Sequence, residues 1–138
     1  MKIAFKGGYK YQLHKEYSAD TTIIPDEDIH TKYIDLDITG HLTIRAGYCW
    51  DGASAMVKDR PSVMRGSLEH DGLYQLFRGG YLSANKYKDR ADRLFQHRCI
   101  DDGVPRWLAS MYYRGLKRFG RAATKAKNQK KILWAPKD

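Results

Sequence analysis

One stretch of the chain decides its fold: SVMRGSLEHDGLYQLFR, residues 62–78. Its apolar and small side chains recur at steps of three and four residues, which is the spacing of one helix face, and His70 lies on that face. The helix start is predicted at Asp59-Arg60-Pro61-Ser62, with the acid or the serine as the cap and a proline in the first turn, and Gly79-Gly80 ends the helix. We therefore predict a helix from about Ser62 to Arg78, with His70 and Asp71 near its middle.

Two more helices are predicted after this one. Ser83 is a good N-cap for the second helix, which Gly103 ends, and its inward stripe comprises Tyr87, Ala91, Leu94, Phe95 and Cys99. Pro105 begins the third helix and Gly120 ends it. The spacing places seven residues on one face of this helix, and we expect that face in the core: Trp107, Leu108, Met111, Tyr112, Gly115, Leu116 and Phe119.

The N-terminal part of the chain is predicted to form strands. Apolar and polar residues alternate over residues 9–13, 34–38 and 42–48, which is typical of strands with one wet face. Thr39-Gly40-His41 separates the last two runs, so we predict a hairpin there. Residues 21–28 contain a proline and three acids, and we expect a loop.

The fold class that follows is α+β, with a small antiparallel sheet in the N-terminal half and three packed helices after it. We expect one domain over all 138 residues: mainly strands over 1–50, helices over 59–120 and a basic tail over 121–138. No apolar run approaches the roughly 20 residues that span a bilayer, so no transmembrane segment is expected. The start of the chain has no signal-peptide core, which favours a cytoplasmic origin and free thiols at Cys49 and Cys99.

The net charge of +9 is concentrated at the C-terminal end. Residues 1–113 hold 16 Lys/Arg against 15 Asp/Glu, whereas residues 114–138 hold 9 Lys/Arg and one Asp. A run of this kind binds an anionic partner such as nucleic acid or an envelope surface, or it stays a solvated tail, because like charges repel. The candidate contacts are Arg114, Lys117, Arg118, Arg121, Lys125, Lys127, Lys130 and Lys131.

His70 and Asp92 are predicted to meet across the first two helices. The short turn from Gly79 to Ser83 makes those helices antiparallel. His70 and Asp92 each lie eight residues from the nearer helix end, or roughly 12 Å along the axis at about 1.5 Å per residue. A carboxylate partner fixes the imidazole tautomer and raises its basicity, as a water-activating general base requires. The alternative is a hydrogen-bonded core histidine without catalytic function.

A metal site is the second chemical hypothesis. Asp71 is turned about 100° from His70 and can point toward the preceding loop, residues 48–54. Carboxylates such as Asp71 and Asp51, together with loop carbonyl oxygens, form the ligand set that calcium prefers. Arg78 pairing with Asp71 would instead leave no metal site. The residues expected to support the site are Trp50, Gly52, Ser54, Tyr74 and Arg78.

The order of several short motifs resembles a phage and prophage family of unknown function. The motifs are Trp50-Asp51-Gly52-Ala53-Ser54, His70-Asp71-x-Leu73-Tyr74, Arg78, Ala91-Asp92-x-x-Phe95 and Gly103-Val104. The resemblance covers roughly residues 40–120. It implies a phage origin, with other virion proteins as partners and the host cytoplasm or the virion as the location.

A smaller part of the chain is similar to the helix pair of secreted and prokaryotic phospholipases A2. Those enzymes have a calcium loop, a helix bearing His-Asp-x-x-Tyr and an antiparallel helix whose Asp orients the His. The likeness implies that His70 activates water, Asp71 binds calcium, Asp92 holds His70, and backbone oxygens near Trp50 and Gly52 complete the metal shell. The chain departs from that pattern, because Glu69 and Leu73 flank the His-Asp pair in place of half-cystines and the loop is not glycine-rich.

Three functions follow from these observations. The first is a metal-assisted hydrolase that acts through His70 and Asp92 on a lipid ester or another envelope component. The second is a non-enzymatic virion or assembly protein in which the polar cluster fixes helix register. The third is a host-directed binder whose basic end holds nucleic acid, although the chain contains no recognisable nucleic-acid-binding motif.

Overall fold

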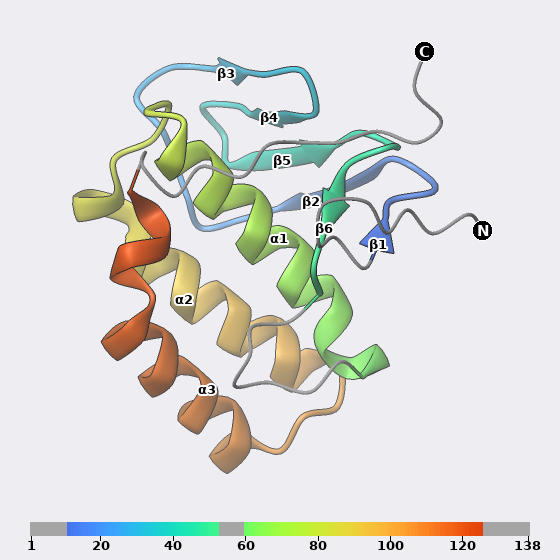
Figure 1. Ribbon diagram of the computed structural model, residues 1–138, viewed down its shortest axis with the longest axis vertical. Helices are drawn as coiled ribbons and strands as arrows, with labels where there is room; N and C mark the ends of the chain where they lie inside the picture. Colours follow the sequence, from blue (N-terminus) through green and yellow to red (C-terminus); the bar gives the residue numbers. More distant parts are fainter. Residues whose placement is uncertain (1–10, 53–59, 126–138) are drawn as a thin grey trace. The chain divides into compact units, whose positions relative to one another are not determined.

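The computed structural model describes residues 11–52 and 60–125. Antiparallel strands fill the N-terminal half and three helices follow them, so the predicted α+β class is confirmed (Figure 1). The described residues form two compact units, a strand unit over 11–52 and a helix unit over 60–125. The single domain stays a prediction.

The strand unit contains a four-stranded antiparallel sheet in the order β2-β5-β4-β3. Its strands are β2 (Tyr17–Asp20), β3 (Ile29–His30), β4 (Ile34–Leu36) and β5 (His41–Ile44). A separate ladder pairs β1 (Tyr11–Gln12) with β6 (Cys49–Trp50). The predicted hairpin is β4 and β5, in which Ile34 pairs with Ile44 and Leu36 with Leu42, and these four side chains are buried.

The hairpin turn explains why β4 ends early. The Asp37 carboxylate accepts hydrogen bonds from the backbone N–H groups of Thr39 and His41, and Gly40 has a φ of +84°. A side chain at Gly40 would also lie 2.7 Å from the carbonyl oxygen of Thr21. Ile38, which the alternation placed in the strand, is therefore in the turn and 54% exposed. The loop predicted over residues 21–28 is confirmed.

The helix unit contains α1 (Pro61–Arg78), α2 (Ala84–Asp101), α3 (Arg106–Phe119) and a short 3-10 helix, η2 (Arg121–Thr124). Helices α1 and α2 run antiparallel, as predicted, and α3 packs beside α2 (Figure 1). Ser83 caps α2 by accepting from the backbone N–H of Lys86. The expected side-chain cap of α1 is absent from the described residues: Arg60 occupies the N-cap and makes no such hydrogen bond, while Pro61 starts the helix. None of these helices combines the length and apolar character that crossing a membrane requires.

The core-facing stripe predicted for α3 is partly wrong. Trp107 is 67% exposed and Met111 is 53% exposed, whereas Ala109 and Tyr112 are buried against Phe95 and its neighbours. The predicted stripe covered a wider arc of α3 than the side of the helix that is buried. Ala109 follows Trp107 by two residues, or about 200° around the axis, so burying Ala109 turns Trp107 outward.

Candidate functional site

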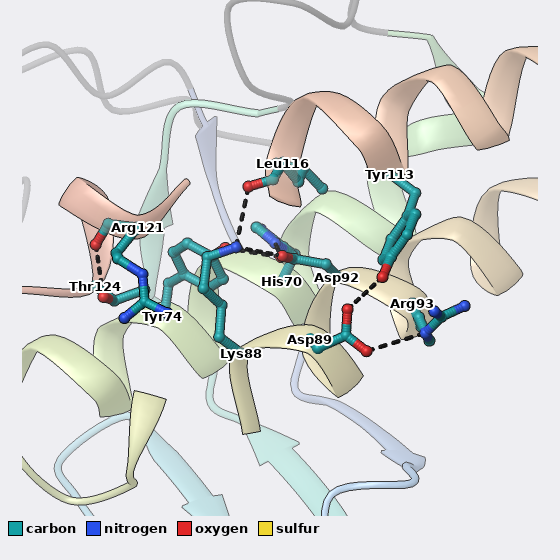
Figure 2. Close-up of polar contacts among 10 residues, drawn as sticks. All are labelled: His70, Tyr74, Lys88, Asp89, Asp92, Arg93, Tyr113, Leu116, Arg121 and Thr124. Atoms are coloured by element: carbon teal, nitrogen blue, oxygen red, sulfur yellow. Dashed lines mark hydrogen bonds and ion pairs between the residues drawn. The ribbon is translucent and has the colours of Figure 1, made fainter. Parts of the chain in front are cut away.

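The centre of the candidate site is the carboxylate of Asp92, which is wholly buried on α2. One oxygen, Oδ1, accepts a hydrogen bond from His70 Nε2 at 2.7 Å and another from the Tyr74 hydroxyl at 2.7 Å. The other oxygen, Oδ2, accepts from Lys88 Nζ at 2.6 Å (Figure 2). The predicted contact between His70 and Asp92 is therefore present across the two helices.

The spacing of residues along each helix accounts for this convergence. His70 and Tyr74 are four residues apart on α1, and Lys88 and Asp92 are four residues apart on α2, so each pair lies on one face of its helix. The His70 ring also lies against the Tyr74 ring, tilted by 35° with 4.1 Å between centroids, and it meets the edge of Phe95 at 5.5 Å. The imidazole is thus held between two aromatic rings and a carboxylate.

The hydrogen bonds determine which tautomer of His70 is present. An ionised carboxylate oxygen only accepts, so His70 Nε2 carries the hydrogen and, in the neutral ring, Nδ1 is an acceptor. The His70 side chain keeps 13% of its surface exposed, in contrast to the sealed Asp92. The arrangement chemically suits an imidazole that takes a proton at Nδ1 while Nε2 stays bonded to Asp92.

Opposing effects act on the pKa of Asp92. Burial alone raises it, but the hydrogen bond and charge of His70, together with the bonds from Lys88 and Tyr74, outweigh burial and lower the pKa below its ordinary value. Burial, and then the charge and hydrogen bond of Asp92, raise the pKa of Tyr74. At neutral pH the site therefore holds an anionic Asp92 and a protonated Tyr74 hydroxyl.

Lys88 and Gly120 also belong to the cluster, although they were not predicted from the sequence. Besides Asp92, Lys88 Nζ donates to the carbonyl oxygen of Leu116 near the end of α3, at 3.0 Å (Figure 2). A side chain at Gly120 would lie 2.7 Å from the Tyr74 hydroxyl and 2.6 Å from that carbonyl oxygen. The four-residue interval between Lys88 and Asp92 was a usable signal. The approach of Gly120 depends on how α3 packs and left no signal in the sequence.

Arg78 connects α1 to η2. Its Nη1 donates to the carbonyl oxygen of Ala123 at 2.9 Å and its Nη2 to Gln75 Oε1 at 3.0 Å. The alternative pairing of Arg78 with Asp71 stays a prediction. Buried Glu69 forms a second ion pair, with the half-buried Arg98, which was not among the candidates. Arg98 Nε donates to Glu69 Oε1 at 2.9 Å.

No family model, curated protein or solved structure matches this chain. The likenesses to the phage family and to phospholipases A2 therefore stay predictions from the motifs.

The residues predicted to bind calcium belong to different units. Asp71 lies on α1 in the helix unit, whereas Trp50, Asp51 and Gly52 belong to the strand unit. Trp50 is buried, and Gly52 has a φ of +83°. Ser54 is outside the described residues. Within residues 11–52 and 60–125, no three His, Cys, Asp or Glu side chains come together in a way that could hold a metal ion. The calcium site stays a prediction.

The predicted contacts for an anionic partner are exposed where the structure describes them. They are Arg114, Lys117 and Arg118 on α3, Arg121 in η2, and Lys125 after it. Arg121 also donates to Asn85 Oδ1 at 3.2 Å. Lys127, Lys130 and Lys131 lie outside the described residues.

Proposed function

We propose that this chain is a phage-encoded, hydrolase-like protein in which His70 is the general base that activates water. One observation carries the proposal: the bond of 2.7 Å between His70 Nε2 and a buried carboxylate that two further donors hold in place. That bond orients the ring and leaves Nδ1 to accept a proton. The phage origin is supported by the ordered motifs alone.

The proposed reaction is the hydrolysis of an ester in a lipid or another envelope component. Water attacks the ester carbonyl carbon and gives its proton to His70 Nδ1, and the imidazolium is stabilised by Asp92. Collapse of the tetrahedral intermediate breaks the ester C–O bond, and the proton passes to the leaving alkoxide. A calcium ion bound at Asp71 would polarise the ester carbonyl.

The test compares His70→Gln with His97→Gln on a panel of soluble and phospholipid esters. His97 is exposed on α2 and away from the cluster contacts described above, so it is a matched control. Loss of a general base typically lowers the rate about 10²- to 10⁴-fold, and we expect that loss for His70→Gln only. A wild-type chain without hydrolytic activity, or equal activity of both variants, would refute the proposal. Calorimetry with calcium and Asp71→Asn tests the metal separately.

A specific contact favours a second function, that of a non-enzymatic virion or assembly protein. Lys88 neutralises Asp92 and also bonds the carbonyl oxygen of Leu116, so the cluster joins all three helices as a polar lock. In that case the other virion proteins are the partners. Mass spectrometry of purified particles tests this function, and absence of the chain from them would count against it.

We also propose an anionic partner for the cationic residues of α3 and η2, either nucleic acid or an envelope surface. The support is their exposure and the charge of the C-terminal end. Either partner predicts binding that weakens as salt rises. The proposed location is the host cytoplasm during infection, with the virion as the second site.

A further inference from the structure

Four exposed side chains form one stripe along the outer side of α3. Trp107 and Met111 are exposed despite their size, and Arg114 and Arg118 are exposed on the same helix. At 100° per residue, positions 107, 111, 114 and 118 fall within about 60° of one another around the axis. We call these four residues the α3 outer stripe.

The α3 outer stripe has an apolar end and a cationic end. Trp107 and Met111 occupy the first half of α3, and Arg114 and Arg118 occupy the second half, where Lys117 and Arg121 add charge nearby. The midpoints of the two halves are about 10 Å apart at 1.5 Å per residue. Exposed apolar side chains with cations beside them on one helix are the arrangement found in helices that lie on membrane surfaces.

We propose that the α3 outer stripe binds the surface of an anionic phospholipid bilayer. Tryptophan favours the boundary between headgroups and acyl chains, and methionine adds flexible apolar contact there. Amphipathic helices bury their apolar side chains roughly 5–10 Å into this boundary. An inclined α3 therefore brings Arg114 and Arg118 to the level of the lipid phosphates, which guanidinium groups bind in bidentate fashion.

The same features fit nucleic acid less well. A helix that follows a nucleic-acid backbone carries cations along its whole contact, because phosphates recur along the strand. Within the α3 outer stripe the cations lie only in the second half, whereas Arg106, at the start of α3, lies outside the stripe. Met111 offers no flat face on which a base stacks. This inference rests on the proposed anionic partner, and of the two candidates it favours the bilayer over nucleic acid. It does not depend on any catalytic role of His70.

The experiment measures binding of the full chain to phosphatidylcholine vesicles with and without about 30 mol% phosphatidylserine. The stripe variants are Trp107→Ser/Met111→Ser and Arg114→Gln/Arg118→Gln. The matched controls are Tyr81→Ser, another exposed apolar residue, and Lys86→Gln/Arg90→Gln, which removes the same charge from exposed positions on α2.

We expect binding only when phosphatidylserine is present. Each cation near an anionic membrane contributes about fivefold in affinity, so losing Arg114 and Arg118 should weaken binding roughly 25-fold. Removing Trp107 and Met111 should weaken it about tenfold and abolish a blue shift of tryptophan emission on vesicles. The controls should stay within about twofold of wild type.

Three results would overturn the proposal. The first is equal binding to vesicles without phosphatidylserine. The second is loss of binding by Arg114→Gln/Arg118→Gln while Trp107→Ser/Met111→Ser binds normally. That result would mean that the cations bind an anionic partner and that the apolar residues do not insert into a bilayer. The third is binding of a single-stranded oligonucleotide through the stripe without vesicle binding. His70→Gln should bind vesicles normally, so failure of the hydrolase proposal is separately visible.

Discussion

At the scale of single residues, Asp92 decides how the site responds to acid. Its pKa is lowered in the folded state from an ordinary value of 3.8, so its ionised form stabilises the fold above that value, and the contribution is lost as pH falls through the folded pKa. We expect the free energy of unfolding of the wild type to fall below about pH 4 more steeply than that of Asp92→Asn.

At neutral pH the same substitution leaves the Lys88 ammonium buried without its carboxylate, at a cost of about 3 kcal/mol. Urea unfolding between acidic and neutral pH measures both effects. Asp101→Asn, an exposed position on the same helix, is the control. Parallel pH profiles for the wild type and Asp92→Asn would contradict the role given to Asp92.

At the scale of elements, Gly120 sets how closely the end of α3 approaches α1. Its φ of −78° suits any residue, so space alone forbids a side chain there. We expect Gly120→Ala to destabilise the chain by about 1–3 kcal/mol, because the methyl group would overlap the Tyr74 hydroxyl and the carbonyl oxygen of Leu116. Thermal unfolding measures this loss.

The contrast that isolates the effect of space is Gly80→Ala. At Gly80 an added methyl group meets nothing within 4 Å, and the φ is +78°. The stability lost in Gly80→Ala therefore measures backbone strain alone. Combining Gly120→Ala with Tyr74→Phe removes one of the two overlaps. The double variant should therefore lose less free energy of unfolding than the two single variants lose together. Strict additivity would show that α3 does not close on Tyr74.

At the scale of the whole molecule, the reactivity of the two cysteines can be used to follow the unfolding of the two units. Cys49 in the strand unit and Cys99 in the helix unit are both buried. Burial raises the pKa of Cys49, and burial with the charge of Asp102 raises that of Cys99 to about 12, so neither thiol should react in the folded chain near neutral pH.

Because a single domain is predicted, we expect both thiols to become reactive over one range of urea. Labelling followed by mass spectrometry of the peptides separates Cys49 from Cys99, and Cys49→Ala and Cys99→Ala supply the assignments. Two distinct midpoints would show that the units unfold independently.

The sequence predicted the elements whose signals are local. The three helices follow from their periodic apolar residues and their glycine and proline ends, and the β4–β5 hairpin follows from strict alternation around Gly40. The contact of His70 with Asp92 was also predictable, because a short turn and equal distances along two antiparallel helices place them at one level.

The short strands β2 and β3 were missed, and β6 lies within the loop predicted over residues 48–54, since two to four residues carry too little periodicity to separate strand from loop. Only the tertiary structure decided which side of α3 is covered, and therefore that Trp107 and Met111 lie outward. It also brought Lys88 and Gly120 into the cluster. Rotation about a helix axis depends on the packing of all three helices together, and local sequence spacing does not contain that information.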